Sequence, residues 1–324
     1  MGRVTRTLGI ISAACVLWVG VMVTVSASST THQSGAPPAK AAAAAKAAPA
    51  TGYVGEETCL TCHENEKKGY HGTAHSRTGN PRTPAANKGC ESCHGPGQAH
   101  VDSGGDKAAI RNPKTLTPKE ASDVCLSCHN RSGHTDWSGG KHDSRNMSCL
   151  TCHSVHEAKP DTKQLKTSGV TETCVQCHAT EVNKIHKSSH MPVGELNGNK
   201  MECTTCHNPH GSQNVKMLKE GNSINEACAS CHAEKRGPFL WDHQVTRESC
   251  TTCHDAHGSN NERMLVAKQP MLCQRCHVAS RHPATIYDQT QVNTRSNRVM
   301  GRSCTQCHSQ IHGSNHPSGN FFLR

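Results

Sequence analysis

The chain has 324 residues and a formal net charge of +10, with 33% hydrophobic and only 3% aromatic residues. This composition excludes an ordinary core built from side chains alone, because too little apolar surface is available for burial. The excess of lysine and arginine is compatible with a nucleic-acid or anionic-membrane partner. The 21 cysteines and 25 histidines need a chemical explanation of their own.

The first 52 residues carry the pattern of an exported and tethered protein. Two arginines precede an apolar run from Leu8 to Val25, and small residues follow it up to Ala27. We expect residues 1–27 to be a cleaved secretory signal peptide, although a run of about 18 apolar residues is also long enough to remain as a membrane anchor. Residues 28–52 are rich in Ala, Pro and Lys and are expected to form a tether. No second long apolar run occurs, so we expect no membrane-spanning helix in the mature chain.

Ten copies of Cys-x-x-Cys-His follow, which we number motif 1 to motif 10. This pentapeptide attaches a c-type haem: the two thiols add to the haem vinyl groups, and the histidine binds one axial face of the iron. A zinc knuckle also uses Cys-x-x-Cys, but it gives no reason for a histidine directly after every second cysteine. We predict ten covalently bound haems c in one domain, residues 53–324. The cysteine outside the motifs, Cys15, lies in the leader and has no predicted role.

The motifs supply the predicted thioether and proximal ligands. The predicted thioether cysteines are Cys59, Cys62, Cys90, Cys93, Cys125, Cys128, Cys149, Cys152, Cys174, Cys177, Cys203, Cys206, Cys228, Cys231, Cys250, Cys253, Cys273, Cys276, Cys304 and Cys307. The predicted proximal histidines are His63, His94, His129, His153, His178, His207, His232, His254, His277 and His308. Together they use 20 of the 21 cysteines, so no pool of thiols remains for disulfides.

Ten haems change what the composition implies. Their macrocycles supply the apolar surface that the side chains lack, so the fold is expected to depend on the cofactors and to be largely lost without them. Their propionates add about 20 negative charges, partly offset by ferric iron. We therefore interpret the basic residues as propionate partners, and predict no nucleic-acid binding.

The motifs alternate between two kinds, which indicates a di-haem repeat used five times. Even-numbered motifs are followed closely by a second histidine, as in CHNPHG and CHDAHG, whereas a polar spacer follows the odd-numbered ones. Helix-start signals at 117–120 and 223–226 precede motifs 3 and 7 and predict short helices. Gly, Pro, Asn and Ser between the motifs predict loops. The predicted fold class is a multihaem cytochrome c: mostly loops with short α-helices wrapped around a chain of ten haems, with little or no β-sheet, as an elongated rod of five di-haem repeats.

The histidine count decides whether the second axial face of each iron can be filled. Ten of the 25 histidines lie in motifs and His32 lies in the tether, which leaves 14 for ten distal positions. A histidine three residues beyond a proximal ligand is on the wrong side of its own haem, so it is expected to reach a neighbouring haem. The predicted distal ligands are His75, His100, His142, His156, His190, His210, His243, His257, His282 and His312. Which of them serves which haem stays open.

The surplus histidines are His71, His134, His186 and His316. We expect each of them to be a solvated or hydrogen-bonded imidazole. Met191, beside His190, is an alternative axial ligand that would raise a potential. Ten irons with two histidines each favour electron transfer, because six-coordinate iron binds no substrate without losing a ligand. A multihaem reductase with one open haem is the enzymatic alternative.

The phrases GCESCHGPGQAHV, ECTTCHNPHGS, RGPFLWDH and CHSQIHGSNHPSG resemble the decahaem periplasmic cytochromes of the MtrA/DmsE type, which include the PioA and MtoA proteins. The resemblance covers residues 52–324, and the predicted distal ligands fall at similar places in that family. It implies a decahaem rod threaded through an outer-membrane β-barrel porin. Such a rod passes electrons between periplasmic carriers and an extracellular partner, which can be another multihaem cytochrome.

The function predicted for this exported chain is conduction of electrons between periplasm and cell exterior, in metal reduction or Fe(II) oxidation. A porin would shield a polar, loop-rich chain from lipid. A filament-forming extracellular cytochrome is a further alternative, which requires complementary ends. The motifs do not encode the direction of electron flow or the haem potentials.

Overall fold

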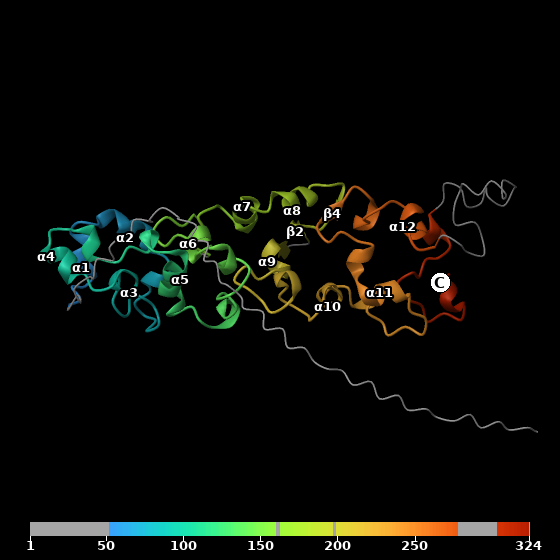
Figure 1. The fold of residues 1–324 in the computed structure, drawn as a ribbon, viewed down its shortest axis with the longest axis horizontal. Helices are drawn as coiled ribbons and strands as arrows, with labels where there is room; N and C mark the ends of the chain where they lie inside the picture. Colours follow the sequence, from blue (N-terminus) through green and yellow to red (C-terminus); the bar gives the residue numbers. More distant parts are fainter. Residues whose placement is uncertain (1–51, 160–162, 197–198, 278–302, 324) are drawn as a thin grey trace, which may run out of the picture. The chain divides into compact units, whose positions relative to one another are not determined.

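The computed structural model describes residues 52–159, 163–196, 199–277 and 303–323 (Figure 1). The predicted signal peptide, all but the last residue of the predicted tether, and His282 lie outside these residues. The described part of the predicted 53–324 domain contains all ten motifs.

Short helices joined by loops make up the chain, and the longest described helix has nine residues. Helices this short are unstable alone in water, so contacts outside each helix must hold it. The first six are α1 (Glu56–Leu60), α2 (Glu64–Tyr70), α3 (Glu91–His94), α4 (Gln98–Asp102), α5 (Pro118–Leu126) and α6 (Cys149–Cys152). The others are α7 (Val170–Val175), α8 (Ala179–Lys184), α9 (Cys203–Cys206), α10 (Ile224–Ala229), α11 (Gln244–Glu248) and α12 (Met271–Gln274).

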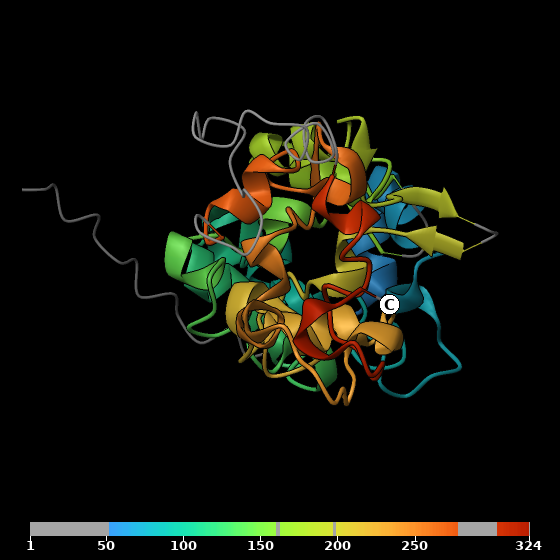
Figure 2. The same ribbon diagram turned by 90° about the vertical axis from the view of Figure 1, so that its right-hand side faces the viewer.

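Strand structure is confined to two small antiparallel pairs within the described residues. Strand β1 (Ser189–His190) pairs with β4 (Gly258–Ser259), so that His190 lies opposite Gly258. Strand β2 (Gly194–Leu196) pairs with β3 (Asn199–Met201), seen as two yellow arrows in Figure 2. The predicted fold class, mostly loops and short helices with little sheet, is confirmed.

The two predicted helix starts differ in how fully they are capped. At α5 the prediction is confirmed: the Thr117 hydroxyl accepts from the Glu120 amide, and the Glu120 carboxylate accepts from the Thr117 amide. At α10 the Ser223 hydroxyl accepts from the Glu226 amide, but the Glu226 carboxylate accepts from Asn222, one residue earlier. The second capping box is thus only half formed.

Three consecutive even motifs are closed by the same turn, which holds the proximal histidine by its backbone. A single β-bridge joins the motif histidine to a leucine, in the pairs His153–Leu165, His207–Leu218 and His254–Leu265. The three leucines are buried, with at most 9% of their surface exposed. Because β-bridges fix the backbone, each imidazole starts from a defined position.

The side-chain core is small, as the composition predicts. The described hydrophobic residues that are buried number eight: Tyr70, Ala121, Trp137, Leu165, Val170, Val182, Leu218 and Leu265. They are dispersed along the chain. A chain of this size without a larger core must obtain its buried surface from something other than its own side chains.

Glu91, inside motif 2, is a buried carboxylate that the sequence did not mark as structural. Only 3% of the residue is exposed, and its oxygens accept from the amides of Val54, Gly55 and Gly97 at 2.7–3.0 Å. Hydrogen bonds to an ionised acceptor are stronger than neutral ones. Glu91 therefore ties the start of the domain to the second motif.

Replacing Glu91 with alanine should release this segment. Each buried amide left without an acceptor costs about 1–3 kcal/mol, so hydrogen exchange at Val54, Gly55 and Gly97 should accelerate at least about tenfold. Exchange measured by mass spectrometry on the holoprotein checks this. Glu57→Ala, which removes an exposed carboxylate nearby, should leave these amides protected, and unchanged exchange in E91A would contradict the role given to Glu91.

Candidate functional site

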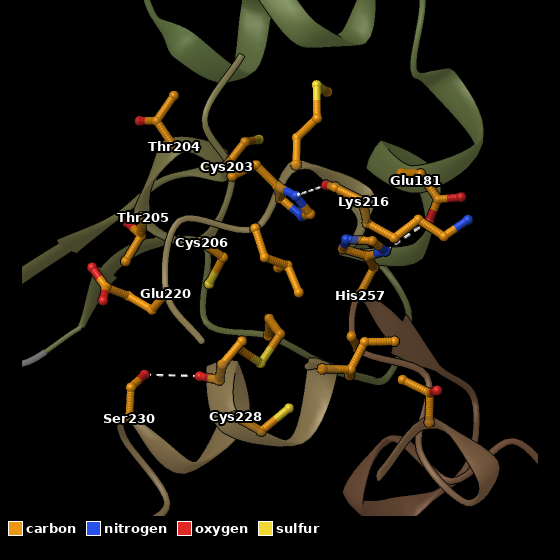
Figure 3. A pocket seen from close by; sticks show the side chains of 18 of the residues that line it. Glu181, Cys203, Thr204, Thr205, Cys206, Lys216, Glu220, Cys228, Ser230 and His257 are labelled. Carbon is orange, nitrogen blue, oxygen red and sulfur yellow. Dashed lines mark hydrogen bonds and ion pairs between the residues drawn. The ribbon is translucent and has the colours of Figure 1, made fainter. Parts of the chain in front are cut away.

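One cavity of about 4350 Å³ collects the chemistry-bearing residues. Ordinary ligand pockets measure about 300–1,000 Å³, so this space suits several large ligands. Its lining includes every cysteine and histidine of motifs 3 to 10. Figure 3 shows one part of it, lined by Cys203 and Cys206 of motif 6 and by Cys228 of motif 7.

The cysteines link each motif to the next without a gap. The first thiols of an odd motif and the following even motif hydrogen bond, in the pairs Cys59–Cys90, Cys125–Cys149, Cys174–Cys203, Cys228–Cys250 and Cys273–Cys304. The second thiols of an even motif and the next odd motif interact electrostatically, in the pairs Cys93–Cys128, Cys152–Cys177, Cys206–Cys231 and Cys253–Cys276. Haems attached through these sulfurs would lie at successive positions along the chain.

These thiol contacts also shift the acidity of the free thiols. Hydrogen bonding to Cys149 raises the pKa of Cys125, and the same bond lowers the pKa of Cys149 to about 6. A thioether bond to haem removes this acidity altogether, because the sulfur then carries no proton. The thiol interactions therefore indicate only how close successive motifs lie.

Eight of the ten proximal histidines lie about 6 Å from a predicted distal histidine. The centroid distances are 6.2 Å for His63–His100, 5.9 Å for His75–His129, 6.2 Å for His94–His156, 6.3 Å for His142–His178, 6.0 Å for His153–His210, 6.0 Å for His207–His257, 6.0 Å for His243–His277 and 6.2 Å for His254–His312. Two imidazoles on opposite faces of one iron, with metal–nitrogen bonds of about 2.0 Å, need roughly this separation. The spacing fits one metal between each pair.

Backbone carbonyls fix the orientation of the even-motif imidazoles. Nδ1 faces a carbonyl oxygen at 2.5–2.9 Å in His94, His153, His207, His254 and His308. In motif 6 the carbonyl belongs to Lys216 (Figure 3). An Nδ1 that donates to a carbonyl leaves Nε2 free as a metal ligand, the usual arrangement for metal-binding histidines.

Several predicted distal histidines are held in the same way. His100, His142, His190 and His243 present Nδ1 to backbone carbonyls at 2.7–3.1 Å. The carbonyl that faces His142 belongs to Pro209, 67 residues later. Each ring is thereby turned with Nε2 available.

In the segments after motifs 6 and 8, the distal histidine candidate is followed by a glycine, and close packing requires glycine at this position. Gly211 and Gly258 adopt φ of 108° and 144°, and an added Cβ would lie 2.0 Å from the Asp136 carbonyl oxygen and 2.3 Å from that of Lys184. Only glycine allows this close approach. The close approach seats His210 and His257 against a neighbouring repeat.

Buried donors in the cavity provide a separate test of whether haem fits. Nε1 of Trp137 and Nε2 of Gln164 are buried without a hydrogen-bond partner, and both residues line the cavity. Buried donors are normally satisfied, and haem propionates are suitable acceptors. Lys163, Lys216 and Arg263 also line the cavity and supply cations for propionates. The residues present therefore fit haem c.

A known relative decides the family. The protein named "Multiheme cytochrome MtrA" from Shewanella baltica (strain OS185) is 43% identical over 282 residues, which are 83% of this chain and 81% of the relative. The chain belongs to the MtrA family of multihaem cytochromes. The resemblance drawn from the sequence motifs is confirmed, and the chain is an electron-transfer cytochrome that binds haem c.

Other comparisons place parts of the chain among multihaem cytochromes. Family profiles match in three places: "Doubled CXXCH motif" at 190–237 and 243–282, "Cytochrome c-type protein NrfB-like" at 90–177, and "Cytochrome c554 and c-prime" at 23–95. "Cytochrome c-type protein NrfB" from Escherichia coli O6:H1 is 29% identical over 131 residues, 39% of this chain and 66% of that protein. "Cytochrome c-554" from Nitrosomonas europaea is 32% identical over 111 residues, 30% of this chain and 45% of that protein.

The histidine pairs of this MtrA-family chain follow a register that the sequence left open. A histidine after an even motif lies against the proximal histidine of the preceding even motif, as His210 does with His153. A histidine that precedes an even motif lies against the proximal histidine of the next odd motif, as His142 does with His178. At the N-terminal end, where no even motif precedes motif 2, His100 lies against His63 of motif 1. Each repeat therefore exchanges imidazoles with both neighbours.

His190 is described but makes no ring contact with His232, the proximal histidine that the register would give it, and His282 lies outside the described residues. The register is therefore observed at eight of the ten motifs.

The surplus histidines have different surroundings. His71 lies 3.7 Å from Glu56, Nδ1 of His316 accepts from the Ser318 amide, and His186 is exposed. The ring of His134 lies 4.2 Å from that of His210 at an angle of 34°, a contact the sequence did not indicate. Burial, together with His134 and the other nearby imidazoles, lowers the pKa of His210 to about 4. His210 is thus neutral at pH 7, the form that binds iron.

Removing one candidate distal ligand should open one iron. In His243→Ala the iron at motif 9 loses the ring that faces His277, so about one tenth of the haem should become high-spin and bind CO. Electron paramagnetic resonance and CO difference spectra of the holoprotein measure this. His186→Ala should leave the spectra unchanged, and an H243A protein that stays fully low-spin would contradict the pairing.

Proposed function

We propose that this chain conducts electrons through ten bis-histidine haems c, one on each motif. The observation that carries the proposal is the unbroken series of interacting cysteine pairs from Cys59 to Cys304, which supports attachment of successive haems at neighbouring positions. The haem supplies the one-electron chemistry of its iron. The protein orients the ligands, excludes water and sets the spacing.

The proposed axial pairs extend the observed register to all ten motifs. We assign His100 to His63, His156 to His94, His75 to His129, His210 to His153, His142 to His178, His257 to His207, His190 to His232, His312 to His254, His243 to His277 and His282 to His308. This assignment closes both faces of every iron. A closed iron carries electrons but has no site for a substrate, so the protein acts as an electron carrier.

If both axial positions of every iron are filled by histidine, the native protein should not bind small ligands. Oxidised protein mixed with nitrite, and reduced protein mixed with CO, should keep their low-spin spectra over minutes in stopped-flow measurements. His243→Ala serves as the positive control. Rapid binding to one tenth or more of the native haem would favour a multihaem reductase with an open site.

The proposed setting is the outer membrane. Membership of the MtrA family and the resemblance of its motifs support a cytochrome exported to the periplasm and enclosed by a β-barrel porin. It would exchange electrons with periplasmic carriers and with an extracellular acceptor or donor, including another multihaem cytochrome. Among the described residues no helix is long and apolar enough to cross a membrane.

Reconstitution tests the trans-membrane wire. Liposomes that contain the cytochrome and its barrel partner, loaded with a reduced redox dye, should lose dye colour within seconds after an impermeant oxidant is added outside. Reversing dye and oxidant tests the other direction. Liposomes with the barrel alone serve as the control, and dye that stays reduced with the complete complex would overturn the proposal.

A further inference from the structure

Carboxylates contact candidate axial imidazoles at three places among the described residues. Glu66 lies 3.3 Å from Nδ1 of His156, and Glu234 lies 3.4 Å from Nδ1 of His232. The closest contact is made by Glu181, whose Oε2 lies 2.7 Å from Nδ1 of His257. That oxygen is buried, although the Glu181 side chain as a whole is 43% exposed, compared with 57% for Glu66 and 58% for Glu234.

A charge network holds Glu181 in place. Glu181 projects from α8 toward His257 (Figure 3), and Nζ of Lys184 lies 3.2 Å from its Oε2. The same Nζ lies 3.2 Å from Asp255, whose other oxygen accepts from the His257 amide. One ammonium thus serves two carboxylates, and one net negative charge remains beside His257.

The preceding repeat provides an internal comparison. His210 occupies the position in CHNPHG that His257 occupies in CHDAHG. Its ring is bordered by the rings of His134, 4.2 Å away, and Trp137, 6.5 Å away. Asn208 stands where the later repeat has Asp255. Two equivalent ligands therefore differ mainly in the charge beside them.

A carboxylate beside Nδ1 makes an imidazole a stronger electron donor. Ferric iron carries one more positive charge than ferrous iron, so the nearby negative charge stabilises the ferric state more. The reduction adds one electron to the iron and breaks no bond. We propose that Glu181 is a positioning residue that lowers the reduction potential of the haem at motif 6 below that of the haem at motif 4. This inference rests on the proposed pairing of His257 with His207.

The consequence is a conductor whose steps differ in energy. Electrons would reside less on the haem at motif 6 than on the haem at motif 4. The fold repeats along the chain, but the charge network around Glu181 does not. The difference in reduction potential therefore arises from individual side chains and needs no change in the fold.

Glu181→Gln in the holoprotein tests the proposal. Glutamine keeps the shape and removes the charge, so one tenth of the haem absorbance should titrate at a higher potential in optical redox titration. The expected shift is at least tenfold in the equilibrium constant, about 59 mV for a one-electron couple. The other nine tenths should titrate as in the native protein, and an unchanged curve would overturn the proposal.

A second variant separates charge from structure. Lys184→Gln removes the cation, so the same tenth of the haem should shift to a lower potential. A purely structural role for the network predicts shifts in one direction for both variants, and that result would also overturn the proposal. Glu172→Gln, which removes an exposed carboxylate on α7, should shift no haem by that amount.

Spin state distinguishes this inference from the proposed function. Native protein and both variants should be fully low-spin, with ten haems per chain by alkaline pyridine spectra. High-spin iron in the native protein would contradict the axial pairs themselves. Low-spin iron with an unchanged titration in E181Q would leave the pairs intact and reject only the tuning by Glu181.

Discussion

The structure depends on pairs of imidazoles that come from different repeats and stand about 6 Å apart. His94 with His156, and His254 with His312, are separated by 6.2 Å in both cases. One ring of each pair belongs to a pentapeptide, and the other comes from a different segment of the chain, earlier or later. An iron bound between them would join segments that share few other contacts. The ligand bonds would then serve as the tertiary contacts of the protein.

This constraint explains why so little conventional structure is needed. Helices such as α3 and α6 have four residues, and the buried leucines serve mainly to seat the proximal histidines. A helix of that length gains almost nothing by itself. Its position is useful because it presents two cysteines on one turn and the histidine directly after them. Proposed covalent attachment then supplies the buried apolar surface that the side chains do not.

A repeating scaffold also allows each site to be adjusted separately. The thiol contacts and the Nδ1 contacts recur from repeat to repeat, which keeps the spacing of the proposed haems even. Around them the charges differ: Glu181 lies against His257, whereas the ring of His134 lies against His210. Spacing governs whether an electron can move, and charge governs where it rests. The scaffold controls the first, and individual side chains control the second.

The sequence by itself determined the class of fold and predicted the attachment sites. Cys203, Cys206 and His207 lie within five residues, so their proposed roles follow from local spacing, and the scarcity of apolar residues predicted a protein without a side-chain core. Counting also gave the set of distal candidates, since His257 and its counterparts recur in each repeat. Only the tertiary structure decided the partners: His142 is oriented by the carbonyl of Pro209, 67 residues later, and Glu181 meets His257 from a separate helix. Such contacts join segments that are distant along the chain, and no local pattern records which distant segment will arrive.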